Sequence, residues 1–356
     1  MKEKNIWKIL SVSLICMVCF FHANTSVQAK KSKECIMLWD AENGEKTEGR
    51  TMRDFMKRRG LFYGESGSCM YTYIKNKKEI KIIGLKLKAK KVKIPTKIHG
   101  RKVTEIELFN PGALEDPLPE VEYISIPQYV KEISMEFKHE IFSSPLLIKL
   151  KKYNVSPKNK FFKSKDGVLF SKDGKRLLDV PRKKKSVNYQ IPYGVRSIAN
   201  RCFESCYRIK AVTMPDTVTK VGDQSFIASG IEKIRLSRNL KSMGESALYR
   251  TKLTEVVFPG SLAEIPEGCL GYCNSLKKVT INPGVRSIGK YAFVRCGNFK
   301  KIIIPPSVKK FGANAFVYTS RFITLKQLNI YVKKTSYAYK RLQKWKKEYK
   351  YKIKTF

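Results

Sequence analysis

The stretch INPGVRSIGKYAFVRC at residues 281–296 nearly repeats a phrase found earlier in the chain, IPYGVRSIANRCFESC at residues 191–206. Let Pro192 be position zero of the earlier phrase. Equivalent positions then follow at steps of 22 or 23 residues, and they are Pro215, Ser237, Pro259, Asn282 and Pro305. The two phrases are therefore the first and fifth of six consecutive repeats.

Apolar columns run through these six repeats. Three residues after position zero stand Val195, Val218, Leu240, Leu262, Val285 and Val308. Eleven residues after it stand Phe203, Phe226, Leu248, Leu270, Phe293 and Phe316. The seventh position is most often glycine, which indicates a turn. A unit this short cannot bury its apolar side chains alone, so the pattern predicts a solenoid in which each turn packs on its neighbours.

Each repeat also carries a segment of the form L-x-x-V-x-I, as at residues 276–281 and 299–304. Its alternation predicts a short parallel strand whose x residues face outward. The Ala-Phe segment that follows position zero predicts a short helix or an irregular turn on the opposite side of the solenoid.

The unit I-P-x-x-V-x-x-I-G-x-x-A-F-x-x-C-x-x-L-x-x-V resembles the BspA-type leucine-rich repeat of exported bacterial and protist surface proteins. The likeness is strong over residues 191–318, and IPTKIHGRKVTEI at residues 94–106 resembles the family's first repeat. The resemblance implies an α/β repeat solenoid with the leucine-rich repeat fold. Such a fold has mostly short parallel β-strands, short helices or irregular turns on the opposite side, and here a C-terminal helical cap.

The N-terminus has the pattern of a secretory signal peptide. Lysines precede an apolar run at residues 9–21, and Ser-Val-Gln-Ala at residues 26–29 supplies a cleavage site. We therefore expect a signal peptide at residues 1–29 and a mature protein that is secreted or associated with the cell wall. The apolar run is shorter than a bilayer span, and an uncleaved anchor is the alternative to cleavage. No second apolar segment follows it, so no transmembrane segment is expected after cleavage.

The mature chain divides into three predicted parts. Residues 30–69 form an N-terminal segment of unknown structure. Residues 70–332 form the solenoid, with a β-hairpin insert at about 156–190 and regular repeats at 191–318. Residues 333–356 form a basic cap, with a helix at 333–350 and a closing strand. A basic amphipathic helix that lies on a membrane is the alternative for the cap helix.

Cysteines recur in the spacing Cys202-x3-Cys206 and Cys269-x3-Cys273, which at first suggests metal ligands. The same columns hold Ser, Ala and Thr in other repeats, so these positions favour any small residue. We expect free cysteines that pack in the core. A disulfide between Cys273 and Cys296, in one column of adjacent turns, is the alternative, and a structural zinc site is less favoured still.

No catalytic pattern is present in the sequence. The mature chain has two histidines, His99 and His139, and it lacks nucleophile-elbow, zinc-helix and phosphate-loop motifs. We therefore predict no catalytic, cofactor-binding or metal-binding residue, and no cofactor. An enzyme would instead show a deep pocket with converging carboxylates or histidines that interrupts the array.

Charge is the most unusual property of the chain, which has 72 Lys and Arg against 30 Asp and Glu and a net charge of +42. The predicted strands place a first outward row at Lys210, Lys233, Arg235, Lys277, Lys278, Lys300 and Lys301. A second row, four or five residues after position zero, holds Arg196, Lys220, Lys241, Arg286, Lys309 and Lys310. Both rows are interrupted in the same repeat, by Glu255 and Glu264. The run at residues 182–185 and the basic tail would extend them.

These rows have two interpretations. They are either the ordinary solvated positions of a very basic protein, or a stripe that binds an anionic polymer such as teichoic acid, a glycosaminoglycan or extracellular DNA. The family resemblance implies a non-enzymatic binding protein that acts in adhesion or surface interaction through the outward face. The expected partner is thus a protein or an anionic polymer at the cell surface, and not a small-molecule substrate.

Overall fold

The computed structural model describes residues 38–39, 46–47, 62–66, 69–73, 78–85, 89–107, 120–134, 147–316, 327–349 and 351–356. The chain forms two compact units, Met1–Thr51 and Met52–Phe356. In the first unit, β1 (Leu38–Trp39) pairs antiparallel with β2 (Lys46–Thr47). The predicted signal peptide lies outside the described residues. Everything below concerns the second unit.

The second unit begins with two sheets. An antiparallel meander continues into parallel strands in the first sheet, whose members are β3 (Phe62–Ser66), β4 (Cys69–Tyr73), β5 (Glu79–Leu85), β8 (Arg101–Glu107) and β10 (Glu132–Ser134). The short β7 (Lys97–Ile98) pairs with β8. A separate parallel sheet has the members β6 (Lys91–Lys93), β9 (Tyr123–Ile126) and β11 (Lys152–Val155).

A hairpin insert separates these early turns from the regular repeats. Its strands are β12 (Phe162–Lys165), β13 (Val168–Ser171) and β14 (Arg176–Asp179). The three strands pair antiparallel in sequence order. The last of them then pairs in parallel with β16 (Ser197–Ile198), the first strand of the regular array in its sheet.

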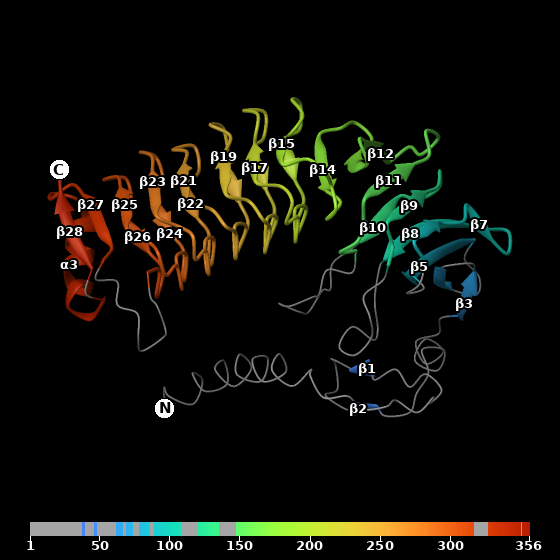
Figure 1. The fold of residues 1–356 in the computed structure, drawn as a ribbon, viewed down its shortest axis with the longest axis horizontal. Helices are drawn as coiled ribbons and strands as arrows, with labels where there is room; N and C mark the ends of the chain where they lie inside the picture. Colours follow the sequence, from blue (N-terminus) through green and yellow to red (C-terminus); the bar gives the residue numbers. More distant parts are fainter. Residues whose placement is uncertain are drawn as a thin grey trace. The chain divides into compact units, whose positions relative to one another are not determined.

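Each regular repeat gives one strand to each of two parallel ladders. The long ladder, here called the strand face, contains β15 (Asn188–Gln190), β17 (Ala211–Thr213), β19 (Lys233–Arg235), β21 (Glu255–Phe258), β23 (Lys278–Ile281), β25 (Lys301–Ile304), β27 (Asn329–Val332) and β28 (Lys352–Thr355). The second ladder contains β16, β18 (Lys220–Val221), β20 (Ser242–Met243), β22 (Glu264–Ile265), β24 (Ser287–Ile288) and β26 (Lys310–Phe311). Strand pairing in both ladders is interrupted at the same repeat boundary, between β19 and β21 and between β20 and β22. Figure 1 shows the strands of the strand face running side by side in sequence order.

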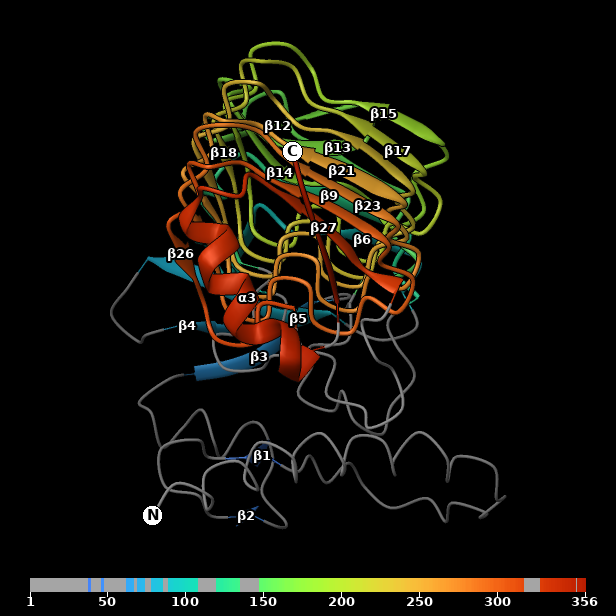
Figure 2. The same ribbon diagram turned by 90° about the vertical axis from the view of Figure 1, so that its left-hand side faces the viewer.

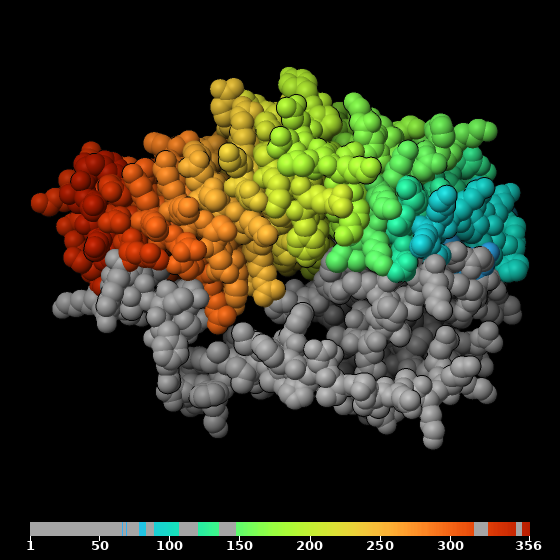
Figure 3. Space-filling view, in the orientation of Figure 1, coloured from blue at the N-terminus to red at the C-terminus, as the bar shows by residue number. Residues whose placement is uncertain are grey.

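The pairing register follows the repeat. Val256 lies opposite Val279, which lies opposite Ile302, and this apolar column continues to Ile330 and Ile353. Nearly all of these side chains are buried, because successive turns cover one another. Figure 3 shows the side chains of successive turns packed against each other. The prediction of a leucine-rich repeat solenoid with short parallel strands is confirmed.

The segments opposite the strands are irregular turns over residues 199–316, and no helix forms there. Left-handed residues recur twice per repeat, as at Ser246 (φ 52°) and Arg250 (φ 57°). Each segment donates its N–H groups to the next turn, for example from Leu248 to the carbonyl of Cys269 at 3.0 Å. An N–H group that donates to a carbonyl of the next turn cannot also form the hydrogen bond of an α-helix to the residue four positions earlier. Of the two predicted alternatives, a short helix or an irregular turn, the helix is therefore excluded.

The seventh-position glycines have a different role from the one that the sequence suggested. Their φ angles lie outside the left-handed region, so they do not need glycine for a turn conformation. A Cβ on Gly244 would lie 2.3 Å from the amide nitrogen of Asp223 in the preceding turn, and a Cβ on Gly289 would lie 2.6 Å from that of Glu267. Close approach of adjacent backbones therefore requires glycine here.

A buried charge network lies at the insert, between two apolar core clusters. Tyr153 belongs to the N-terminal cluster, and its hydroxyl donates to Asp179 at 2.8 Å. Asp179 also pairs with Arg182, whose Nη2 lies 3.7 Å from Glu204 of the first regular repeat. Arg201 completes the network at 3.1 Å from Glu204. These bonds join the insert to the regular array through groups that are almost fully buried.

A single described helix, α3 (Tyr337–Tyr349), covers the last turn. Ser336 caps its N-terminus by accepting a bond from the Tyr339 N–H at 3.1 Å. Its apolar side buries Ala338 and Leu342, and the ring of Trp345 packs edge-on against Phe311 at 5.8 Å. The helix thus gives the terminal core face a cover, as a repeat array needs. In the described parts of the chain, no helix is long and apolar enough to span a bilayer.

The six described cysteines are free and buried, so the alternative of a Cys273–Cys296 disulfide is wrong in this structure. Cys273 donates to the carbonyl of Leu248 at 3.1 Å, and Cys296 donates to the carbonyl of Leu270 at 3.0 Å. Thr251, in the same column, bonds to the Leu248 carbonyl as well, at 2.9 Å. These three members of the column thus donate to a carbonyl of the preceding turn or of their own segment, whereas the buried hydroxyl of Ser229 finds no partner among the described residues.

Candidate anion-binding site

The first predicted basic row lies on the strand face, where its members occupy outward positions. Lys278 lies directly opposite Lys301, and the N–H of Lys300 donates to the carbonyl of Lys277 at 3.0 Å. Neighbouring strands are about 4.8 Å apart. Like charges at this spacing repel one another and destabilise the sheet. Within the described part of the chain, none of these four lysines forms an ion pair with a carboxylate.

The other members of this row are mostly neutralised. Lys210 pairs with Glu232 at 2.9 Å, and Arg235 lies 3.7 Å from Asp216. Lys233 is exposed, and it has no ion pair among the residues that the structure describes. Free positive charge on the regular part of the strand face is thus concentrated toward its C-terminal end.

The tail adds two lysines to that end. β28 continues the ladder, which places Lys352 opposite Asn329 and next to the column of Lys278 and Lys301. Tyr331 lies between two ammonium groups, with Lys301 at 4.6 Å and Lys354 at 5.8 Å from its ring centroid. We call this set the C-terminal lysine cluster, and its members are Lys277, Lys278, Lys300, Lys301, Lys352 and Lys354.

The second predicted row lies on the second ladder and not on the strand face. Lys220 and Lys310 are within its strands, and the others stand immediately beside them: Arg196, Lys241, Arg286 and Lys309. All six side chains are exposed. Figure 2 shows β18 and β26 on the opposite side of the array from β15, β17 and β23. The two rows therefore form two surfaces, and a single bound polymer strand cannot lie along both ladders at once.

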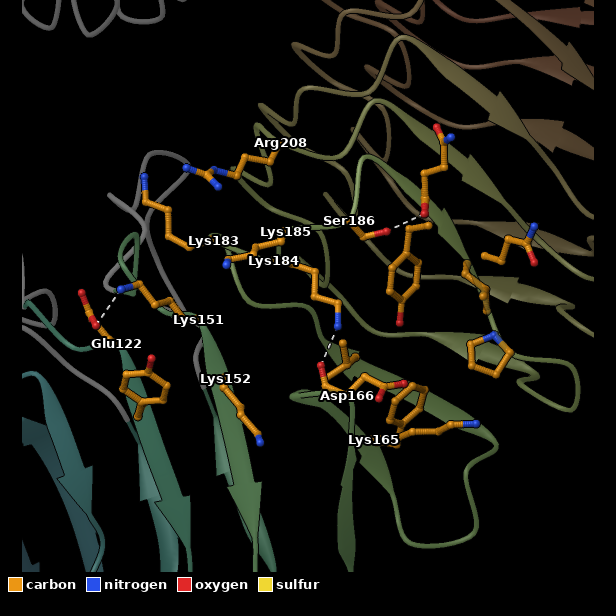
Figure 4. A pocket seen from close by; sticks show the side chains of 18 of the residues that line it. Glu122, Lys151, Lys152, Lys165, Asp166, Lys183, Lys184, Lys185, Ser186 and Arg208 are labelled. Carbon is orange, nitrogen blue, oxygen red and sulfur yellow. Dashed lines mark hydrogen bonds and ion pairs between the residues drawn. The ribbon is translucent and has the colours of Figure 1, made fainter.

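A cavity of about 1140 Å³ lies where the strand-face ladder is interrupted. β11 belongs to one parallel sheet and β15 begins another, with the hairpin insert between them. The cavity walls come from the end of β9, the residues around β11, the β12–β13 turn, the loop after β14, and β15 (Figure 4). Sequence reasoning did not predict this cavity, although the run at residues 182–185 supplies part of its wall.

The wall is strongly basic. Its charged residues are eight bases and two acids, namely Lys149, Lys151, Lys152, Lys165, Lys183, Lys184, Lys185, Arg208, Glu122 and Asp166. Lys151 pairs with Glu122 at 2.8 Å, and Lys149 pairs with Glu120 at 2.5 Å. Arg182 does not contribute, because it is buried in the charge network. That position corrects the expectation that it would extend an exposed basic row.

Five of these cations have no partner among the residues that the structure describes. Among the described residues, no hydrogen bond or ion pair holds the side chains of Lys152, Lys165, Lys183, Lys185 and Arg208. Lys184 is fixed instead, since its Nζ donates to the carbonyl of Asp166 at 2.5 Å. Figure 4 shows the labelled basic side chains arranged around the opening. The cavity therefore concentrates uncompensated positive charge that an anion can neutralise.

The remaining lining is apolar and aromatic. Val168, Phe170, Tyr189 and Ile191 are buried residues that form the inner wall, and Tyr193 stands at the rim with 87% of its surface exposed. Burial raises the pKa of Tyr189, so its hydroxyl remains a neutral donor at physiological pH. An apolar inner wall with a polar rim is the usual composition of a ligand pocket.

The cavity interrupts the array, but its lining does not have the converging carboxylates or histidines expected of the enzyme alternative. No histidine is in its lining, and its two carboxylates do not converge, because Glu122 is held by Lys151 while Asp166 lies on the hairpin turn. The hydrogen bond to Glu122 raises the pKa of Lys151, which keeps that amine protonated and unable to act as a nucleophile. The described residues contain no group of three or more His, Cys, Asp or Glu side chains that could hold a metal ion.

One solved structure supports the leucine-rich repeat fold, and two others are similar at lower TM-scores. The solved structure of a leucine-rich repeat protein from Eubacterium ventriosum is similar to this chain with a TM-score of 0.52. The two sequences are 20% identical, and the match covers 66% of this chain and 67% of that protein. The pneumococcal vaccine antigen PcpA is 16% identical over 83% of this chain and 98% of its own, with a TM-score of 0.48. A leucine-rich cell surface protein from Faecalibacterium prausnitzii is 22% identical over 65% and 59%, with a TM-score of 0.40. No curated protein gives a match.

The family model for the BspA-type leucine-rich repeat region matches six copies over residues 187–336. These residues include every regular repeat that was aligned from the sequence, and the E. ventriosum structure indicates the same fold. The predicted resemblance is confirmed: residues 187–336 of this chain are a BspA-type leucine-rich repeat region.

Proposed function

We propose that this protein is a non-enzymatic binding protein that acts outside the cell and holds an anionic polymer along its strand face. The observation that carries the proposal is the C-terminal lysine cluster. Lys278 and Lys301 stand directly opposite each other on neighbouring strands, and neither they nor the adjacent Lys277 and Lys300 have a carboxylate partner among the described residues. A bound polyanion would remove their mutual repulsion and release its own counterions.

The expected location agrees with this class of partner. A chain with a secretory signal pattern meets teichoic acids, glycosaminoglycans and extracellular DNA rather than cytosolic nucleic acid. With a net charge of +42 in the full sequence, such a protein also associates with an anionic surface over a distance of a Debye length, about 8 Å at physiological ionic strength.

The test compares two variants of equal charge. The first replaces Lys277, Lys278, Lys300 and Lys301 by Ala, and the second replaces four exposed lysines of the tail, Lys333, Lys340, Lys344 and Lys346. Binding of each variant to heparin and to poly(glycerol phosphate) is measured across a salt series. If all four strand-face lysines contact the polymer, the slope of log K against log salt falls by about 3, and affinity at 0.15 M salt falls on the order of 100-fold.

The tail variant is the control, and we expect it to lose less than about 3-fold in affinity at the same salt concentration. Equal losses in the two variants would mean that charge acts diffusely, which contradicts the proposal. Wild-type binding that persists unchanged at 1 M salt would also contradict it. That result would favour a protein partner held by apolar and aromatic contacts.

A further inference from the structure

We infer that the cavity between β11 and β15 binds a short anionic saccharide, one that carries sulfate or phosphate esters. This inference rests on the proposed function, because the cavity continues the same strand face and takes one stretch of the same polymer. It adds a defined pocket to what would otherwise be a charged surface. The ligand is recognised by two features together, uncompensated cations around the opening and the exposed tyrosine rings of the lining.

The cations come from separate elements and meet around one opening. Lys152 belongs to β11, Lys165 ends β12, Lys183 and Lys185 lie in the loop after β14, and Arg208 belongs to the next repeat. Backbone bonds hold the loop in place, since the N–H of Lys183 donates to the carbonyl of Leu150 at 2.8 Å. Ser186 also donates to the carbonyl of Asn188 at 2.5 Å. The positions from which these cations project are thus fixed before any ligand binds.

The lining suits a sugar ring better than a bare inorganic ion. Tyr123 and Tyr193, 37% and 87% exposed, offer ring faces that can contact the C–H face of a pyranose. The almost fully buried Val168, Phe170 and Ile191 close the cavity behind them. The rim tyrosine, Tyr193, can cover a ring from the open side. A volume of about 1140 Å³ is somewhat larger than the range of about 300–1,000 Å³ usual for ligand pockets, so more than one sugar unit fits.

A sulfated or phosphorylated saccharide also fits the charge better than duplex nucleic acid. Duplex DNA presents its phosphates on a wide, convex surface, which lysines on a flat ladder can follow but which cannot enter a pocket. A short saccharide can place its ester groups at the rim while its ring contacts the exposed tyrosines. Single-stranded nucleic acid remains an outcome that the test distinguishes.

The test uses the mature protein and calorimetric titration with four probes of equal length. These are a heparin-derived tetrasaccharide, a tetrasaccharide with phosphate monoesters, neutral maltotetraose, and a thymidine tetranucleotide. The cavity variant replaces Lys183, Lys185 and Arg208 by Ala. The matched control replaces Lys277, Lys278 and Lys300 by Ala, and therefore removes the same charge from the other end of the strand face.

We expect the cavity variant to lose at least 10-fold in affinity for an anionic tetrasaccharide, while the control loses less than 2-fold. Maltotetraose should not bind measurably, and the two anionic saccharides together show whether sulfate or phosphate is preferred. Tyr193→Ala provides a second variant, since an exposed rim residue does not affect folding. It should weaken the tetrasaccharide several-fold without changing the salt dependence, because a tyrosine ring carries no charge.

Equal losses in the cavity and control variants would overturn the inference, as would binding of the tetranucleotide as tight as that of the saccharides. If neither anionic tetrasaccharide binds while long heparin still binds with a steep salt dependence, the cavity inference fails and the proposed function stands. If long heparin does not bind either, the proposed function itself fails.

Discussion

The buried charge network at the insert allows a quantitative prediction about how the two cores are joined. Arg182→Met removes the guanidinium that pairs with Asp179 and Glu204 while it keeps most of the side-chain volume. In this variant Glu204 keeps its ion pair with Arg201, whereas Asp179 keeps only the hydrogen bond from the Tyr153 hydroxyl. Burial already raises the pKa of Asp179 in the intact protein. Without the guanidinium, we expect this carboxyl to protonate rather than remain buried as an unpaired charge.

Protonation of Asp179 sets the size of the effect. An unfolded aspartate has a pKa of about 3.9, so protonating it at pH 7 costs about 4 kcal/mol at 1.36 kcal/mol per pH unit. This is the upper limit of the loss, because the intact protein, in which the pKa of Asp179 is already raised, carries part of the same cost. The folded-state pKa of this acid lies above its unfolded value, and stability therefore falls as pH rises between the two values. The upper limit accordingly shrinks to about 1.5 kcal/mol at pH 5. Guanidinium unfolding followed by circular dichroism at both pH values measures the two losses.

Lys185→Met is the control, because it removes the same charge from an exposed position nearby. Its expected effect on the free energy of unfolding is below about 0.5 kcal/mol. A loss below about 1 kcal/mol for Arg182→Met would show that Asp179 does not depend on this guanidinium. A loss of the same size at pH 5 and pH 7 would refute the protonation argument.

Two further predictions concern the core of the array. Gly244→Ala places a Cβ 2.3 Å from a backbone nitrogen and should lower the free energy of unfolding by about 1–3 kcal/mol. Gly297→Ala is the control, because its Cβ meets nothing within 4 Å and the change should be neutral or stabilising by up to about 1 kcal/mol. Equal effects of the two changes in thermal unfolding would contradict the close-approach argument. Burial raises the pKa of the Cys273 thiol to about 11 and that of the Cys206 thiol to about 12. In mature protein with Cys35→Ser, a chromogenic disulfide reagent at pH 8 should therefore react with the six described cysteines only after unfolding, and rapid reaction of any of them in native protein would contradict this.

The regular part of the fold could be predicted from the sequence because its apolar columns repeat with a fixed period. The opposite-side segments could not be decided in the same way. A segment such as residues 245–250 contains residues compatible with a helix, and local propensity does not include the bond from Leu248 to Cys269 in the next turn. The local pattern likewise predicts a turn role for Gly244, whereas the residue is in fact constrained by the backbone of a neighbouring repeat.

The candidate site was predictable only in its simplest part. Alternation along the strand placed Lys278 and Lys301 outward, and the structure pairs them in register. This alternation could not show which cations form ion pairs with carboxylates. Lys210 and Glu232, for example, belong to different repeats and pair only because those repeats stack on each other. The cavity arises where an insert interrupts a sheet, so its wall combines distant segments. Its one local signal was the basic run at residues 182–185, of which Arg182 proved to be buried.

Lysine acetylation footprinting of the wild-type protein, read by mass spectrometry with and without long heparin, tests the central claim most directly. The account predicts that heparin protects Lys278 and Lys301 on the strand face and Lys185 at the cavity, while Lys241 and Lys309 beside the second ladder stay as reactive as in free protein. Equal protection of both ladders would mean that heparin is held by diffuse charge. Protection of the second ladder alone would place the binding surface on the wrong side of this account.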